Sequence, residues 1–346
     1  MNISKTKFIN WTRCPMYFPM DLKFNPTEKA DIDDERERRE ERLAELREGV
    51  KSSDGFDAED EEFDAQPWPE LEALLPYYNK VEEEALKVAK KYFRGTLIAN
   101  SKDVHGQKLF EYELHGHTYR CYVDIYNENE EEINIIEVKA TTNRKYLDAK
   151  EKALLDRFSD VGKYTHDLAF QRFVIEQALR LAGETRPVNY YLAVLNCQYE
   201  YDGVRDAMGE CVYNKINGQE IIVFMNMNEV TEKYQPIILD EVSKLEKFIS
   251  TPHDISAKVP VGKWCAWGGR TECLFCSHCF KRLRDVPDTN KANNYLYFRG
   301  FKSGGIKDKY QLINEGYWKL DDVPSGWLTS ENHKIQRDCF DNGTEH

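Results

Sequence analysis

Hydrophobic and polar residues alternate with two different periods along this chain, and the change of period outlines the expected elements. Five short segments are apolar at every second residue or continuously, which is typical of β-strands. We predict strands at Leu109–Leu114, Tyr119–Tyr126, Ile133–Val138, Val188–Asn196 and Glu220–Met225. Longer segments repeat their apolar residues at helical spacing. We predict helices over Tyr77–Phe93, Asp160–Leu181 and Glu229–Ser250, and a short helix within residues 3–20, interrupted at Cys14-Pro15.

The order of these elements indicates the fold class. Strands followed by a long helix and a further strand predict an α/β (α+β) core, built on a mixed sheet flanked by helices. Gly116 separates the first two strands and Asn127–Glu132 separates the next two. Both pairs are therefore expected to form hairpins.

The chain has 346 residues, enough for one large domain with appendages or for two domains. We divide it into five parts by composition and pattern. They are an N-terminal helix at 1–27, an acidic arm or linker at 28–75, a core at 76–260, a cysteine-rich loop at 261–285 and an extension of unassigned role at 286–346.

The acidic charge is concentrated in one segment. The chain has a net charge of −13, and residues 28–65 hold 17 acidic and 7 basic residues, which account for −10 of it. We expect Asp34–Val50 to be a solvated helix or arm and Asp54–Asp64 a linker. The nearly neutral remainder is compatible with a basic groove for nucleic acid, but strong nonspecific DNA affinity is not predicted.

Hydropathy and cysteine usage suggest a compartment. No apolar run reaches the roughly 20 residues that cross a bilayer, and the N-terminus lacks the apolar core of a signal peptide. We expect a soluble cytoplasmic protein with no membrane partner. In that compartment clustered cysteines, among nine in the chain, indicate metal binding or catalysis rather than disulfides.

A carboxylate–lysine group is the first candidate for chemistry. Asp124 ends one strand, and Glu137 and Lys139 lie two residues apart on the next, so that they share a face. A hairpin would bring the carboxylates together as ligands for Mg²⁺ or Mn²⁺, with the Val138 carbonyl as an extra ligand. Lys139 would orient the attacking water or stabilise negative charge. A chance Glu-x-Lys triplet is the alternative, but charges on a buried strand require a partner.

The long helix adds a second polar pair, Asp167 and Gln171, which are four residues apart and share one edge. The glutamine could hydrogen-bond a catalytic carboxylate or a DNA phosphate. A solvated edge residue is the alternative interpretation.

Five cysteines form the second candidate site. Four crowd into one stretch, where close spacing suits a zinc ion or an iron–sulfur cluster, at positions Cys265, Cys273, Cys276 and Cys279. The C-terminal group could supply all four ligands, or three with Cys14 as the fourth. A lone buried thiol is the alternative for Cys14. We interpret the other cysteines as structural, namely Cys121, Cys197, Cys211 and Cys339.

These motifs together resemble the PD-(D/E)XK nuclease superfamily. The resemblance rests on Ser4-Lys5-Thr6-Lys7-Phe8, Arg13-Cys14-Pro15, Asp124, Glu137-Val138-Lys139-Ala140-Thr141-Thr142 and the terminal cysteines. More narrowly, the chain is similar to the RecB-like branch with a [4Fe–4S] cluster, which includes CRISPR-associated adaptation exonucleases. It also resembles the N-terminal nuclease domain of an uncharacterised bacterial family. The likeness spans roughly residues 1–285 and is weakest across 28–75.

The resemblance implies a restriction-endonuclease-like core with Asp124 and Glu137 as metal ligands, Lys139 as the catalytic lysine and Gln171 as the helix glutamine. It also implies a cluster that ties the chain ends together through Cys14, Cys265, Cys273 and Cys279. Cys276 is then surplus, and it could replace one of these ligands.

Two further positions depart from the branch. Its histidine ligand on the helix before the core has no counterpart in Tyr77–Phe93, where Glu83 or Glu84 is the candidate substitute. The tyrosine that often follows four residues after the glutamine is replaced by Ile175.

The expected function is that of a metal-dependent deoxyribonuclease, an exonuclease acting on DNA ends or single strands. Its expected partners are DNA and other proteins of a repair or defence complex, and the oligomeric state is left open. One rival is a non-catalytic nucleic-acid or protein-binding module on a zinc-stapled, nuclease-like fold. A second rival is a sequence-specific endonuclease of restriction type.

Overall fold

The computed structural model describes residues 1–12, 14–24, 69–99, 106–251, 260, 275, 279, 314–317 and 331–342. They belong to two compact units, Met1–Thr12 with Thr27–Ser250 and Arg13–Pro26 with Thr251–His346, each taken by itself below. The expected arm at Asp34–Val50 and linker at Asp54–Asp64 lie outside the described residues.

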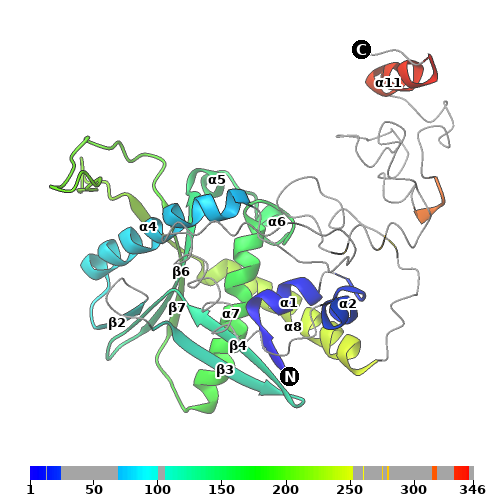
Figure 1. Cartoon of the computed structure of the whole chain (residues 1–346). Helices are drawn as coiled ribbons and strands as arrows, with labels where there is room; N and C mark the ends of the chain where they lie inside the picture. Colours follow the sequence, from blue (N-terminus) through cyan, green and yellow to red (C-terminus); the bar gives the residue numbers. More distant parts are fainter. Residues whose placement is uncertain are drawn as a thin grey trace, which may run out of the picture. The chain divides into compact units, whose positions relative to one another are not determined.

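Two mixed sheets form the framework of the first unit (Figure 1). Their strands are β1 (Asn2–Ser4), β2 (Thr96–Ala99), β3 (Lys108–Leu114), β4 (His117–Val123), β5 (Ile125–Glu128), β6 (Ile133–Thr142), β7 (Val188–Leu195) and β8 (Ile222–Asn226). The smaller sheet has the order β1-β4-β3 and the larger one β2-β5-β6-β7-β8. Only β1–β4 and β6–β7 pair in parallel among the described strands.

Helices flank these sheets. The first unit contains α1 (Lys5–Trp11), α4 (Pro69–Tyr92), α5 (Arg144–Leu147), α6 (Glu151–Leu154), α7 (Gly162–Leu181) and α8 (Asn228–Ser250). The second unit contains α2 (Tyr17–Phe24) and α11 (Glu331–Asn342). None of the helices in the described ranges combines the length and the apolar character needed to cross a membrane.

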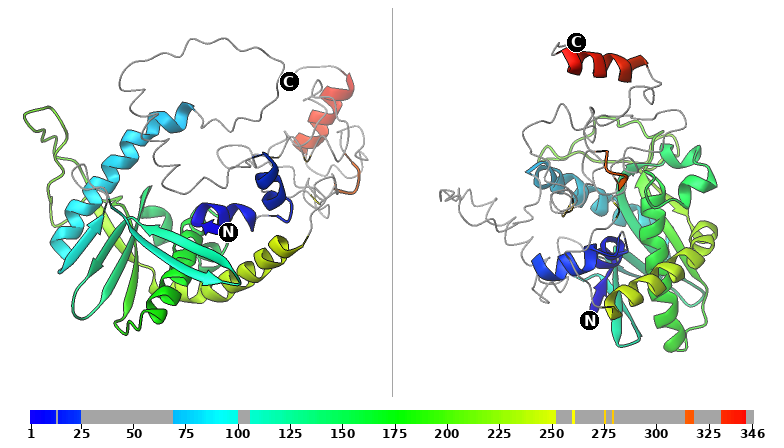
Figure 2. Two further views of the ribbon diagram at one scale, coloured as in Figure 1. Left: turned by 60° about the horizontal axis from the view of Figure 1, so that its bottom comes forward. Right: turned by 90° about the vertical axis from the view of Figure 1, so that its right-hand side faces the viewer.

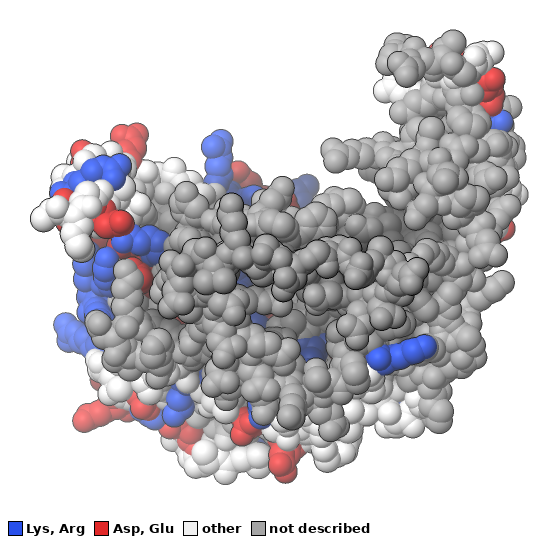
Figure 3. All heavy atoms as spheres, viewed as in Figure 1, with Lys and Arg blue, Asp and Glu red and all other residues white. Residues whose placement is uncertain are grey.

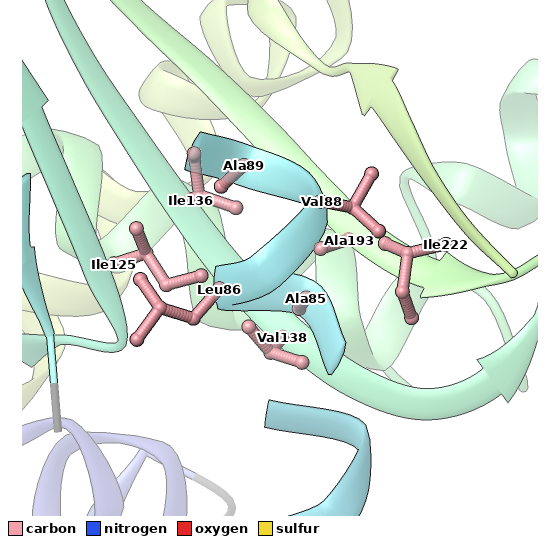
Figure 4. Packing of buried hydrophobic residues seen from close by; sticks show 9 residues of the cluster. All are labelled: Ala85, Leu86, Val88, Ala89, Ile125, Ile136, Val138, Ala193 and Ile222. Atoms are coloured by element: carbon pink, nitrogen blue, oxygen red, sulfur yellow. The ribbon is translucent and has the colours of Figure 1, made fainter. Parts of the chain in front are cut away.

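Helix α4 covers one face of the larger sheet. Its apolar residues meet side chains from four strands in one buried cluster (Figure 4), made of Ala85, Leu86, Val88, Ala89, Ile125, Ile136, Val138, Ala193 and Ile222. Because side chains alternate along a strand, Ile136 and Val138 face α4 while Glu137 between them faces the other way. The packing of α4 therefore fixes which residues of β6 reach the opposite face.

Helix α7 packs on that opposite face, against β3, β4 and β7, and α8 packs on α7 (Figure 2). Ten residues of α7 are buried, among them Leu168, Phe170 and Gln171. Phe173 contributes two edge-to-face contacts, with Tyr112 and Tyr119, at ring-centroid distances of 5.7 and 5.9 Å. On the face of β6 that carries Glu137, Gln171 of α7 contacts the Glu137 carboxylate.

A chain of asparagines crosses the larger sheet. Asn134 donates to Asn127 at 2.9 Å, Asn189 donates to Asn134 at 3.1 Å, and Asn228 donates to Asn189 at 2.9 Å. Buried amides need such partners, and each amide here finds one on the adjacent element. The chain links β5, β6, β7 and the start of α8 at one register.

The structure confirms the α/β class and both hairpins, β3–β4 and β5–β6. The interruption expected at Cys14-Pro15 is confirmed, because α1 ends at Trp11 and α2 begins at Tyr17, whereas strand β1 at the start of this segment was not predicted. One element prediction was wrong. The strand expected at Tyr119–Tyr126 is broken at Asp124, where the chain leaves one sheet and joins the other. Strand β2 and helices α5 and α6 were not predicted, because four-residue elements have too little periodicity of their own.

Candidate active site

Asp124 lies at the junction between the two sheets, between the last residue of β4 and the first of β5. The β5–β6 register pairs Ile125 with Ile136, so Asp124 lies opposite Glu137. The Val138 backbone N–H donates to Asp124 Oδ2 at 2.8 Å, and the Gln107 amide donates to Oδ1 at 3.2 Å. The break in the strand therefore turns the Asp124 carboxylate toward the edge of β6.

Glu137 is the centre of the site and has no exposed surface. Lys5 Nζ donates to its Oε1 at 2.6 Å, and Lys139 Nζ donates to the same oxygen. The Gln171 side-chain amide donates to Oε2 at 2.5 Å. All three donors come from different elements, α1, β6 and α7, which converge on one buried carboxylate.

Helix α7 supplies two residues of this group. Gln171 is completely buried, and its Oε1 has no hydrogen-bond partner among the described residues. Asp167 lies one turn earlier, with its Oδ2 3.8 Å from Lys139 Nζ. The structure thus brings together Asp124, Glu137, Lys139 and Gln171, and the glutamine makes the contact with a carboxylate that its position suggested.

The two carboxylates have opposite electrostatic surroundings. Burial raises the pKa of Asp124 to about 7, and the negative charge of Glu137 adds to the rise. Burial alone would also raise the pKa of Glu137, but the charges of Lys139 and Lys5 overcome it and hold the pKa well below its ordinary value. Glu137 is therefore held in its ionised form, while Asp124 keeps its proton to a higher pH than an ordinary aspartate.

Both lysines keep their charge. Burial would lower the pKa of Lys139 and of Lys5, but the attraction of Glu137 raises both above their ordinary value. Neither ammonium group is thus suited to act as a neutral base. Each is a fixed positive charge at the edge of a carboxylate pair.

The donor set at this site suits a hard divalent cation. Asp124 and Glu137 offer carboxylate oxygens, and the Val138 carbonyl belongs to the same stretch of β6. Mg²⁺ and Mn²⁺ prefer such ligands, and Mg²⁺ is commonly held by only one or two carboxylates together with several waters. The unpartnered, buried Oε1 of Gln171 is an acceptor that a water in the site would satisfy. The described residues include no cluster of three or more His, Cys, Asp or Glu side chains suited to a metal.

The sequence analysis assigned no role in the site to Lys5 or to Glu82. Lys5 is 132 positions from Glu137, and nothing local indicates their contact. On α4, the charge that acts on Asp124 is that of Glu82, rather than Glu83 or Glu84. Glu84 is instead paired with Lys87 at 2.7 Å.

Tyr146 is a further residue that sequence reasoning missed. It is buried on α5, directly after β6, and its hydroxyl has no partner among the described residues. Burial raises its pKa, and the charges of Lys139 and Asp167 also act on it. Its hydroxyl is a free donor beside the candidate site.

Two of the candidate cluster cysteines, Cys14 and Cys279, are among the described residues of the second unit. Cys265, Cys273 and Cys276 lie outside the described residues. Cys14 O accepts from Tyr17 N at 3.1 Å, and Cys279 N donates to Phe275 O at 3.0 Å. The rings of Tyr17 and Phe275 meet edge to face with centroids 5.0 Å apart. Tyr17, three residues after Cys14, is therefore in contact with Phe275, four residues before Cys279.

Basic side chains gather at the C-terminal end of α4, where the helix leads into β2 (Figure 3). Lys87, Lys90, Lys91 and Arg94 are all exposed. Lys91 contacts Glu220 at 3.1 Å. Cations near a helix C-terminus also complement its dipole, so this surface has a structural explanation of its own.

Comparison of the sequence with models of known protein families gives no match, and comparison with curated proteins gives none either.

Proposed function

We propose that this protein is a metal-dependent nuclease of the PD-(D/E)XK type that hydrolyses DNA phosphodiester bonds, as an exonuclease acting on ends or single strands. The observation that supports it is the convergence of two carboxylates, a lysine and a buried glutamine at the junction of two sheets. Charged groups collected in a protein interior require a functional or structural reason, because burying them costs free energy.

The residues divide the work as follows. Asp124, Glu137 and the Val138 carbonyl would hold Mg²⁺ or Mn²⁺. When bound, the cation neutralises charge on the phosphoryl oxygens and lowers the pKa of water. Lys139 stabilises the negative charge that develops as the bond breaks. Gln171 fixes the orientation of the Glu137 carboxylate, as an outer hydrogen-bond partner of a metal ligand commonly does.

The direct test is cleavage of labelled single-stranded and double-stranded DNA with Mn²⁺, by the unmodified protein and by Glu137→Gln. We expect Glu137→Gln to reduce the rate roughly a hundredfold or more. Glu131→Gln, in the exposed turn between β5 and β6, is the matched control and should cleave normally. Equal rates for the two variants would contradict the assignment of Glu137. Resistance of circular single strands would support an exonuclease, and discrete products from circular DNA would favour an endonuclease.

We further propose a [4Fe–4S] cluster held by Cys14, Cys265, Cys273 and Cys279, with Cys276 as the alternative for one of the last three. The contact between Tyr17 and Phe275 supports it, because these residues flank the two described cysteines. A cluster needs four thiolates, and its role here would be to join distant segments of the chain.

A non-catalytic binding module with a zinc staple is the second candidate. The observation in its favour is that Glu137 already accepts from three donors, as a purely structural ion-pair network would. Binding of DNA without cleavage in any divalent cation, together with zinc and no iron in the purified protein, would favour this alternative.

A further inference from the structure

Lys5 lies in the candidate site although it belongs to neither the Asp124–Glu137 hairpin nor α7. Its Nζ is 2.6 Å from Glu137 Oε1, and its side chain keeps 24% of its surface exposed. Lys139 donates to the same oxygen and is 20% exposed. Two ammonium groups thus share one carboxylate oxygen, and Lys139 has Asp167 as a second partner, with its Oδ2 3.8 Å from Lys139 Nζ.

Three features fix the position of Lys5. It is the first residue of α1, which is capped by Ser4, whose hydroxyl accepts from Lys7 N at 3.2 Å. Strand β1 precedes it and pairs in parallel with β4. Phe8, one turn later, stacks on Phe170 of α7 with centroids 4.4 Å apart. Lys5 is therefore held beside Gln171, which follows Phe170.

The far end of α1 is also fixed, by a group of largely buried polar side chains. Arg157 donates to Ile9 O at 2.5 Å and to Thr12 Oγ1 at 2.9 Å. Its guanidinium also contacts Glu241 at 2.6 Å, and Glu241 contacts His166 at 2.6 Å. We name Arg157, Glu241 and His166 the α1 clamp. Because α1 is held at both ends, the side chain of Lys5 has the fixed position that a binding site requires.

We propose that Lys5 is a second cation of the active site, which binds a phosphate of the substrate strand. This inference rests on the proposed function, since it assigns the substrate contact of the same site. A lysine ammonium is a compact point charge suited to phosphate oxygens. The partial exposure of its side chain leaves it accessible to a bound strand. Divalent cation on Asp124 and Glu137 would compete with Lys5 for the carboxylate oxygen, which would make the ammonium available to phosphate.

The alternative is that Lys5 serves only to neutralise Glu137. The two roles separate in a Glu137→Gln background, because that variant has no charge at position 137 to neutralise. There, Lys5→Met leaves no unpaired charge at position 137, and Lys139 remains 3.8 Å from Asp167, so the double variant is expected to fold. Lys7→Met in the same background is the matched control, since Lys7 lies on the same helix with its Nζ 3.5 Å from Asn2 O.

The experiment measures the affinity of these three variants for a short single-stranded DNA in metal-free buffer at several salt concentrations. We expect Lys5→Met to weaken binding about tenfold relative to Glu137→Gln alone. The slope of log affinity against log salt should fall by about 0.7, the value for one contact to a single strand. Lys7→Met should change neither quantity.

Equal affinity and slope with and without Lys5, or no DNA binding at all by Glu137→Gln, would overturn the inference. Cleavage by the unmodified protein is assayed in parallel and tests the proposed function separately. An inactive protein whose DNA binding depends on Lys5 would overturn the nuclease and retain Lys5 as a phosphate-binding residue. A protein that cleaves DNA but binds it equally well without Lys5 would support the nuclease and overturn the role of Lys5.

Discussion

Asp124 and Glu137 are neighbours across one hairpin, yet their protonation has opposite effects on folding. The pKa of Asp124 rises to about 7 in the folded protein, mainly through burial. The folded state therefore binds a proton that the unfolded chain has lost, and stability falls as pH rises from about 4 to 7. The pKa of Glu137 is lowered by Lys139 and Lys5 despite burial. Ionised Glu137 therefore contributes to the stability of the fold above its ordinary pKa, and this contribution is lost as the pH falls below that value.

The raised pKa of Asp124 predicts a pH-dependent metal affinity. Below pH 7 a proton competes with the cation for the Asp124 carboxylate, so Mn²⁺ affinity should rise about tenfold per pH unit up to about 7 and then level off. Titration calorimetry with Mn²⁺ at pH 5.5 to 8.5 measures this directly. Asp124→Asn should bind weakly with a flat profile, whereas a flat profile in the unmodified protein would contradict the role of Asp124.

At the scale of elements, the helices and strands predicted most accurately were those with a clear repeat of apolar residues. Helices α7 and α8 and strand β7 were found within two residues of their observed bounds, because each holds enough apolar residues to show its period. The hairpin that joins Asp124 and Glu137 was also predictable, since alternation and a short polar turn define it. The break at Asp124 was not, because strand-forming residues continue through it and only the second sheet explains the bend.

Lys5 shows why part of the site escaped prediction. Its contact with Glu137 depends on how α1 packs on α7 and on the α1 clamp, and both join segments more than 130 residues apart. Contacts of this kind arise from tertiary packing and leave no period or spacing in the sequence. Gln171, in contrast, lies on a long helix whose polar edge was visible.

The α1 clamp makes a prediction about the stability of this element. Arg157→Met removes the guanidinium partner of Glu241, whose side chain is 11% exposed, and frees the end of α1. We expect a loss of about 3 kcal/mol in the free energy of unfolding, since breaking a buried ion pair is strongly destabilising even though His166 still contacts Glu241 at 2.6 Å. Urea unfolding measures it.

Two further variants make this test specific. Glu241→Gln combined with Arg157→Met should recover part of the loss, because no charge is then left unpaired. Arg180→Met, at an exposed position near the end of α7, should have little effect. A loss as small for Arg157→Met as for Arg180→Met would show that the clamp does not stabilise α1.

At the scale of the whole chain, the candidate cluster cysteines come from two distant parts of the sequence. Cys14 and Cys279 are separated by 265 positions, yet both belong to one compact unit. A link across so long a loop removes much of the conformational freedom of the unfolded chain. The spacing of the cysteines and the family resemblance were the only grounds for expecting Cys14 to share a site with the C-terminal cysteines. Neither could distinguish zinc from an iron–sulfur cluster, because both kinds of site use the same thiolate ligands.

The cluster proposal is tested by the metal content of protein purified without oxygen. We expect about four irons per chain and broad absorbance in the visible range. Cys14→Ser should lose most of the iron and become less soluble, whereas Cys197→Ser, at an exposed position, should keep both properties. Unchanged iron in Cys14→Ser would remove Cys14 from the cluster, and zinc in place of iron would overturn the cluster itself.

The position of α1 in the chain has a consequence for biosynthesis. This helix leaves the ribosome before its partners Glu137, Arg157 and Glu241, which follow more than 120 residues later. Synthesis proceeds at roughly 5–20 residues per second, so α1 waits on the order of 10 to 50 seconds before Glu241 is made. During that time Phe8 and Trp11, both buried in the finished fold, have no completed surface to cover them. The nascent chain is therefore expected to expose these two aromatic side chains until the later segments have been made.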